Sequence, residues 1–218
     1  MKTARIKGSG VEYPIGKIVC LARNYVEHIR ELGNDTPTQP VLFMKPSSSV
    51  IGDGEVIHIP AYSQECHHEV ELALIIGSGG KDIPEGEALG HIAGYGVALD
   101  MTLRDVQNEL KKKGLPWEIA KGFDTSCPLS EFVAGEEVGD PQTLRLRLVI
   151  NGEVRQDGTT DHMIHSVRQI VSHVSTIFTL EPGDVILTGT PSGVGPVRSG
   201  DRLQAELVGL VRLEVMVA

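Results

Sequence analysis

The sequence has few of the features expected of secreted, membrane-bound or nucleic-acid-binding proteins. Its only three cysteines, Cys20, Cys66 and Cys127, match no metal or redox motif, which favours a reducing compartment. It contains no apolar stretch of about 20 residues, and its basic N-terminus lacks the apolar core of a secretory signal. The 29 acidic and 20 basic residues give a net charge of −9, which argues against a nucleic-acid partner. We therefore expect a cytoplasmic protein without a membrane or nucleic-acid partner.

Short apolar or alternating runs dominate the chain and are bounded by glycine, proline, asparagine or aspartate. They predict strands near 17–21, 41–45, 56–59, 69–76, 92–99, 144–150, 184–188 and 202–217. Asn151-Gly152 predicts a hairpin turn. Helical patterns are confined to about 25–32, 103–113 and 161–178. The fold class is therefore mostly β with a few helices (α+β), in a chain of 218 residues that fits one domain.

Two glutamates, Glu69 and Glu71, stand at i and i+2 of a predicted strand. Their side chains then share one face, about 7 Å apart. Like charges this close repel, and a raised pKa or a bound cation resolves the repulsion. Carboxylate oxygens with no accompanying Cys/His set favour Mg²⁺, Mn²⁺ or Ca²⁺. The alternative is a solvated end of an edge strand.

Asp100 follows the apolar run 94–99, at the end of a predicted strand. One alternative makes it the N-cap of the next helix, but Thr102 and Asp105 fit the spacing of a capping box better. That prediction leaves Asp100 free as a third oxygen ligand beside Glu69 and Glu71.

His28 and Glu31 are neighbours on one surface of a short predicted helix. A carboxylate beside an imidazole fixes its tautomer and raises its basicity, which suits a general base near neutral pH. The alternative is a surface ion pair. The polar, proline-flanked segment 33–40 that follows predicts a mobile loop or lid.

Four further side chains are candidates on weaker grounds. Lys121 could balance a developing enolate or bind a carboxylate, although most lysines are simply exposed. Arg23 precedes the short helix, and Gln107 lies on roughly the Asp100 face of the next one. Thr190 belongs to a Gly-rich loop that could present N–H groups and its hydroxyl to a carboxylate, or could be a plain turn.

Together these residues resemble the fumarylacetoacetate hydrolase family, most closely its short acylpyruvase and oxaloacetate decarboxylase branch, from about Lys17 to the C-terminus. The segments that carry the resemblance are Arg23-Asn24-Tyr25, Phe43-Met44-Lys45-Pro46, His68-Glu69-Val70-Glu71, Ala98-Leu99-Asp100-Met101-Thr102, Ala120-Lys121-Gly122-Phe123-Asp124 and Leu187-Thr188-Gly189-Thr190-Pro191.

The resemblance implies an N-terminal segment of residues 1–16 and a single catalytic domain, 17–218, folded as a mixed β-sandwich roll in a homodimer. It implies Mg²⁺ or Mn²⁺ held by Glu69, Glu71 and Asp100, and a His28–Glu31 dyad on a lid. Lys121 would face the reacting centre. The separate N-terminal domain of fumarylacetoacetase is absent, which makes fumarylacetoacetate a doubtful substrate.

We therefore expect metal-dependent C–C bond cleavage of small 2-oxo acids. The reaction would be hydrolysis of acylpyruvates to pyruvate and a carboxylic acid, decarboxylation of oxaloacetate, or both. One alternative is an isomerase or decarboxylase of unsaturated 2-oxo dioates of the 2-hydroxyhepta-2,4-diene-1,7-dioate type. Another, from a different class, is a non-catalytic module that binds a keto acid and a metal.

Overall fold

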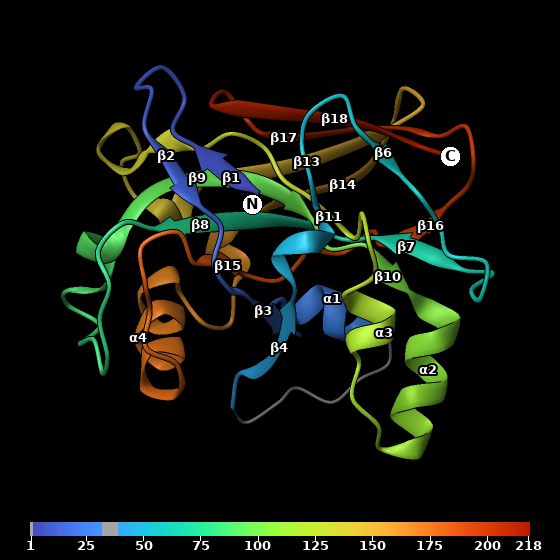
Figure 1. Ribbon diagram of the computed structural model, residues 1–218, viewed down its shortest axis with the longest axis horizontal. Coiled ribbons are helices and arrows are strands. Elements are labelled where there is room, and N and C mark those ends of the chain that lie inside the picture. The colour runs from blue at the N-terminus through green and yellow to red at the C-terminus, as the bar shows by residue number, and fades with distance from the viewer. Residues whose placement is uncertain (1, 32–38) are drawn as a thin grey trace.

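Two β-sheets stacked face to face form the centre of the molecule (Figure 1). The computed structural model describes residues 2–31 and 39–218, and the side chains of residues 28–30 are not described. The six-stranded sheet has the order β12 (Val133–Ala134), β9 (Ile92–Leu99), β8 (Val70–Ile76), β15 (Val185–Leu187), β3 (Ile18–Ala22) and β4 (Val41–Lys45). The five-stranded sheet has the order β14 (Glu153–Thr159), β13 (Arg145–Ile150), β17 (Arg202–Leu207), β18 (Val211–Val217) and β6 (Val56–Ile57).

Strand β8 lies near the centre of the molecule and is buried at every position. Its even-numbered side chains, such as Leu72 and Leu74, belong to the main hydrophobic core together with apolar residues of the five-stranded sheet. Ala73 and Ile75 belong to a second, smaller core on the other side. This alternation follows from the two-residue period of a strand. Glu71 therefore shares the side of Ala73 and Ile75, away from the five-stranded sheet.

Three small sheets complete the β structure. They pair β1 (Thr3–Arg5) with β2 (Glu12–Pro14), β5 (Val50–Ile51) with β11 (Cys127–Pro128), and β7 (Cys66–His68) with β10 (Thr102–Leu103) and β16 (Gly195–Val197). Cys20, Cys66 and Cys127 are all buried, and each is a free thiol.

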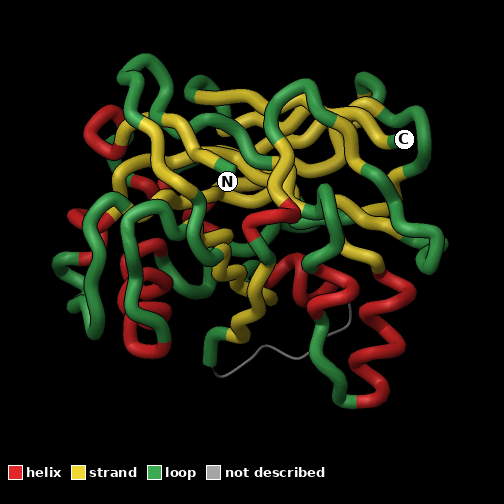
Figure 2. The backbone as a smooth tube through the Cα atoms, viewed as in Figure 1, coloured by secondary structure: helices red, strands yellow, loops and turns green. Residues whose placement is uncertain are grey.

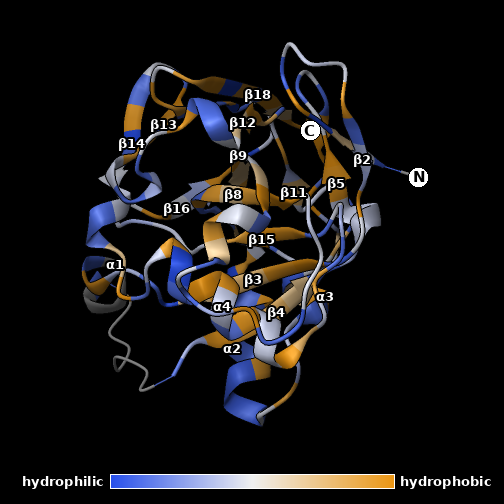
Figure 3. Ribbon diagram, turned by 90° about the vertical axis from the view of Figure 1, so that its left-hand side faces the viewer, coloured by the Kyte–Doolittle hydropathy of each residue, from blue (hydrophilic) through white to orange (hydrophobic). Residues whose placement is uncertain are grey.

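The α-helices flank strands β3 and β4, with α4 (Val167–Ile177) on one side and α1 (Val26–Glu31), α2 (Arg104–Lys113) and α3 (Glu118–Lys121) on the other (Figure 1; Figure 2). Short 3₁₀ turns lie at Ser47–Ser49, Ala88–His91, Gly135–Glu137, Pro141–Thr143 and Thr160–His162. Apolar residues concentrate on the strands of the interior, whereas the outer surface of α2 is polar (Figure 3). No helix within the described ranges is long and apolar enough to cross a membrane.

The mostly β prediction is confirmed, but some predicted boundaries are wrong. Helix α4 starts six residues later than predicted, because Ser166 and Gln169 form a capping box there. The predicted strand 202–217 is a hairpin of β17 and β18. The run 69–76 begins as a strand only at Val70, because Glu69 lies between β7 and β8. The turn at Asn151-Gly152 is confirmed, with φ of 51° and 86°.

The predicted capping box of Thr102 and Asp105 is wrong. Leu103 precedes α2 and makes no side-chain cap. The Thr102 hydroxyl instead donates to the carbonyl of Asp100, and Asp105 accepts from the hydroxyl of Ser63 at 2.7 Å. Asp105 is thus occupied by a loop about 40 residues earlier in the chain, a partner that local spacing does not reveal.

Candidate active site

The pairing of β8 with β9 brings three carboxylates together. The register sets Val70 opposite Leu99, and the next pair along is Glu69 and Asp100, whose backbones are joined by a 2.8 Å hydrogen bond from Asp100 N to Glu69 O. Glu71 lies one residue inside β8. Glu69, Glu71 and Asp100 are all buried, and each offers an oxygen within 4.8 Å of the others. The structure thus brings together the three residues predicted as metal ligands.

Two buried lysines neutralise part of this acidic cluster. Lys121, from the last turn of α3, places Nζ 2.9 Å from Glu69 Oε2, 2.5 Å from Asp100 Oδ2 and 2.6 Å from the hydroxyl of Thr102. Lys45, at the end of β4, places Nζ 2.8 Å from Asp100 Oδ1. Lys121 is only 3% exposed, so the ordinary surface lysine considered as an alternative is ruled out.

Burial favours the neutral form of the Lys121 amine, but the charges of Asp100 and Glu69 outweigh this effect and raise its pKa. Lys121 is therefore charged at neutral pH. It supplies a fixed positive charge at the carboxylates, and it is not available as a free base.

Glu71 is in a different electrostatic position. Its Oε2 accepts a 2.6 Å hydrogen bond from Gly189 N–H, and no salt bridge of Glu71 exists among the described residues. Burial, followed by the charges of Asp100 and Glu69, raises the pKa of Glu71 well above its usual value. A buried carboxylate with no cationic partner is costly. This makes Glu71 the side chain that gains most from an added cation.

Helix α2 contributes a second layer of contacts. Arg104 forms an ion pair with Glu69 through Nη2, and its Nη1 donates to Gln107 Oε1 at 2.7 Å. Gln107, which was predicted to lie on roughly the Asp100 face of this helix, is buried and lines the same cavity as Glu69 and Glu71. Arg104 was not predicted as a site residue, although it lies one helical turn before Gln107 in the sequence.

The Gly-rich loop after β15 reaches the same cavity through Thr190. Gly189 has a φ of 93°, and a side chain there would meet Cβ of Asn24 at 2.8 Å, so glycine is needed for its N–H to approach Glu71. The Thr190 hydroxyl donates to Val70 O at 2.8 Å and accepts from Gln156 Nε2 at 2.8 Å. Its only proton is thus already used within the protein.

Gln156 of β14 joins this loop to the start of β8. Its Nε2 donates to the Thr190 hydroxyl, and its Oε1 accepts from the backbone N–H of Val70 and contacts Nδ1 of His68, both at 3.0 Å. Every polar atom of the Gln156 side chain is therefore engaged. Sequence reasoning missed Gln156, because a glutamine in a strand of the other sheet carries no signal of such a role.

Of the predicted dyad, only Glu31 can be placed. Its carboxylate accepts from the backbone N–H of Gly193 at 3.1 and 3.2 Å. His28 lies on α1, but its side chain is outside the described residues. Most of the predicted lid, 33–40, is outside them as well. Arg23 lies just after β3 with a φ of 61°, a strained value for arginine, and lines the cavity.

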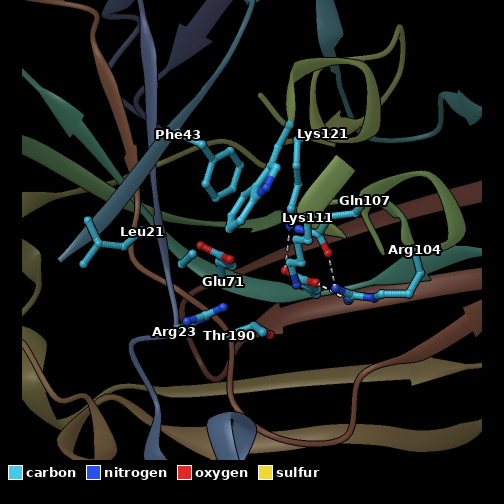
Figure 4. Close-up of a pocket in the computed structure, with 12 residues that line it drawn as sticks. Leu21, Arg23, Phe43, Glu71, Arg104, Gln107, Lys111, Lys121 and Thr190 are labelled. Carbon is cyan, nitrogen blue, oxygen red and sulfur yellow. Dashed lines mark hydrogen bonds and ion pairs between the residues drawn. The ribbon is translucent and has the colours of Figure 1, made fainter. Parts of the chain in front are cut away.

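Aromatic side chains form another wall of the cavity. Phe43 and Trp117 pack with their ring centroids 6.1 Å apart, and Lys121 Nζ lies 4.9 Å from the Phe43 centroid. Figure 4 shows Phe43 above the carboxylates, with Arg23 approaching from the side opposite Arg104 and Gln107. Aromatic residues make up only 4% of the chain, which has a single tryptophan. That rarity was a sequence signal for Trp117 that the sequence analysis did not use.

The donor set fits a divalent cation of the Mg²⁺ or Mn²⁺ type. The ligand atoms are all carboxylate oxygens, which such hard cations prefer, and the cluster includes a buried glutamate without a cationic partner. Cationic side chains and the Thr190 loop surround the cluster, so a small anion could lie against it. The arrangement suits chemistry in which negative charge develops on a bound oxygen.

Comparisons with known proteins agree with this geometry. Residues 17–218 match the family described as fumarylacetoacetate (FAA) hydrolase C-terminal. Oxaloacetate tautomerase FAHD1, mitochondrial, of Bos taurus is 50% identical over 200 residues, covering 92% of this chain and 90% of the relative. Oxaloacetate tautomerase YcgM of Escherichia coli (strain K12) is 50% identical over 204 residues, covering 93% of each chain.

A solved structure has nearly the same fold. The fumarylpyruvate hydrolase from Pseudomonas aeruginosa, in complex with Mn²⁺ and pyruvate, superimposes with a TM-score of 0.95 at 39% identity. The match covers 100% of this chain and 95% of that one. The likeness therefore includes both stacked sheets and the helices that carry the site.

Proposed function

Because the chain belongs to the fumarylacetoacetate hydrolase family, whose members are enzymes, we propose that it converts small 2-oxo acids with the help of a divalent metal. The reaction we favour is the interconversion of the enol and keto forms of oxaloacetate. The observation that carries this proposal is the buried triad of Glu69, Glu71 and Asp100, two members of which, Glu69 and Glu71, line a cavity together with four cationic side chains. Relatives that are 50% identical over nine-tenths of both chains support the choice of oxaloacetate.

The triad would hold Mg²⁺ or Mn²⁺. Such a cation, when bound, supplies Lewis-acid stabilisation of the negative charge that develops on the 2-oxo oxygen. The residues of the chain would bind the substrate, hold positive charge near it and move the protons. In ketonisation, a proton leaves the C2 hydroxyl of the enol and a proton is added at C3. Lys121, which stays protonated, contributes positive charge beside Glu69 and Asp100 while this happens.

Substrate binding would use Arg23, Gln107 and Thr190. The Thr190 hydroxyl donates to Val70, so we assign its role to the backbone N–H, which has no acceptor among the described residues. We keep the prediction that His28, oriented by Glu31, is a general base that activates water for acylpyruvate hydrolysis, and we propose that the same pair moves the proton at C3 in ketonisation. These assignments are proposals.

The second candidate is C–C bond cleavage at the same site: hydrolysis of an acylpyruvate, or decarboxylation of oxaloacetate. The high similarity to a fumarylpyruvate hydrolase supports it. Both reactions place negative charge on the same 2-oxo oxygen, so one site can serve them. Isomerisation of unsaturated 2-oxo dioates is a further possibility within the family, and a homodimer in the cytoplasm stays an expectation.

The test is a comparison of three reactions with one enzyme preparation. We would measure the decay of the ultraviolet absorbance of enol-oxaloacetate, pyruvate release from oxaloacetate, and pyruvate release from acetylpyruvate, with Mg²⁺, with Mn²⁺ and with excess chelator. We expect metal-dependent enol decay to have the highest kcat/KM. Faster acetylpyruvate hydrolysis would favour the second candidate. Tight binding without turnover of any 2-oxo acid would leave only the non-catalytic module.

A further inference from the structure

Three residues of one face of α2 line the cavity: Arg104, Gln107 and Lys111. They are spaced i, i+3 and i+7, as expected for one face of a helix. Arg104 contacts Glu69 of the triad. Lys111 starts two turns further on, about 10 Å along the helix axis, and its side chain leans back toward the helix N-terminus. Its side chain therefore lines the cavity, and among the described residues it forms no ion pair with the carboxylates of the triad.

Lys111 is half-buried and has no carboxylate partner among the described residues. Its Nζ lies 5.4 Å from the centroid of the Trp117 ring. Burial, together with the positive charges of Arg104, Arg23 and Lys121, lowers the pKa of Lys111 to about 8. The adjacent Lys112, by contrast, is exposed and donates to Glu109 at 2.7 Å.

The charges around the cavity are not balanced. Among the described residues, its lining includes four cationic side chains, Arg23, Arg104, Lys111 and Lys121, and two anionic ones, Glu69 and Glu71. Asp100, which pairs with Lys121 behind the lining, adds a third negative charge, so one positive charge remains in excess. This excess occurs in a chain whose net charge is −9. A divalent cation at the triad would increase it further. A ligand with a single carboxylate, bound at the triad, would leave the positive charge of Lys111 without a negative partner. A dianion would place one negative charge at the triad and a second one near Lys111.

We propose that Lys111 binds the distal carboxylate of a 2-oxo dicarboxylate, and that it selects such diacids over 2-oxo monocarboxylates of the same length. Trp117 holds the Lys111 stem and ammonium in place through its ring face. The inference rests on the proposed function only in that the 2-oxo end of the ligand must lie at the triad.

The test compares two unreactive ligands of equal length, 2-oxoglutarate and 2-oxopentanoate, which differ by a distal carboxylate in place of a methyl group. Dissociation constants are measured by titration calorimetry with Mg²⁺ for the wild type, Lys111→Met, Lys111→Arg and the control Lys112→Met. We expect Lys111→Met to reduce the preference for the diacid at least about 10-fold, the size of a lost charge-assisted hydrogen bond. Lys111→Arg should keep most of the preference, and Lys112→Met all of it.

Affinity for 2-oxopentanoate should be the same in all four proteins. An equal loss for both ligands in Lys111→Met would mean that Lys111 only shapes the cavity, and would overturn the proposal. An unchanged preference, or no binding of either acid by the wild type, would overturn it too. A Lys111-dependent preference without turnover of oxaloacetate would uphold the inference while refuting the proposed reaction. Circular dichroism of each variant checks that it folds.

Discussion

Glu71→Gln tests most clearly how the buried charge of the site affects the free energy of unfolding. In the metal-free protein the pKa of Glu71 is raised by burial and by Asp100 and Glu69, so the folded state keeps a proton that the unfolded chain releases above about pH 4.5. Folding is therefore favoured by this group at low pH. This contribution to the free energy of unfolding is lost as pH rises from the pKa of Glu71 in the unfolded chain through its pKa in the folded protein. Over that range the free energy of unfolding falls by up to about 1.4 kcal/mol per pH unit.

Glutamine resembles the protonated acid in size and hydrogen bonding, and it does not titrate. We expect metal-free Glu71→Gln to lose this slope and to be at least as stable as the wild type at pH 7. Stabilisation by a bound metal should show the opposite pattern, large in the wild type and small in the variant. A cation at 100 times its Kd stabilises the wild type by about 2.7 kcal/mol, whereas the variant should gain little. Urea unfolding from pH 5 to 8, with Mn²⁺ and with chelator, measures both effects.

Glu85→Gln is the matched control, since it makes the same chemical change at an exposed loop position. It should keep the pH slope and the stabilisation by Mn²⁺. If metal-free Glu71→Gln were instead destabilised at pH 7 by 2 kcal/mol or more, the carboxylate would be ionised and stabilising in the wild type. The electrostatic reasoning about the triad would then be wrong.

Three further predictions concern other parts of the site. Lys45→Met should lower the free energy of unfolding by about 3–5 kcal/mol in urea, because it leaves the buried Asp100 without its 2.8 Å partner; no change would refute the ion pair. Gln156→Leu should cost about 1–3 kcal/mol and raise KM, since it frees the Thr190 hydroxyl and leaves a buried N–H unpaired; a change in neither stability nor KM would contradict its positioning role. His28→Ala should slow acetylpyruvate hydrolysis about 10²–10⁴-fold, because His28 is proposed to activate the attacking water, and should slow oxaloacetate decarboxylation less, because that reaction needs no water nucleophile; equal losses would restrict His28 to shaping the site.

The sequence was sufficient to single out the three carboxylates of the triad but not their arrangement. The two-residue period of a strand predicted that Glu69 and Glu71 share one face, and in the structure both line the same cavity. Asp100 was recognisable because it ends an apolar strand. That it lies opposite Glu69 depends on the register of β8 and β9, which a pattern within one strand does not specify.

The cations around the triad were harder to predict. Lys45 and Arg104 are 1% and 7% exposed, yet most residues of these types lie on the surface. Their burial follows from long-range pairing, in which β4 lies against β3 and α2 against the triad. The capping box failed for the same reason, because Asp105 binds a distant loop. Local spacing describes helices and strands well, but it does not describe partners that only the tertiary fold supplies.

The central claim is that Glu69, Glu71 and Asp100 together hold the catalytic metal. An anomalous difference map from a crystal grown with Mn²⁺ and pyruvate tests it most directly. We predict one strong peak that lies about 2.0–2.3 Å from a carboxylate oxygen of each of the three residues, with pyruvate density on the side of Thr190 and Gln107. The absence of a peak there, or a peak held by other side chains, would contradict the account.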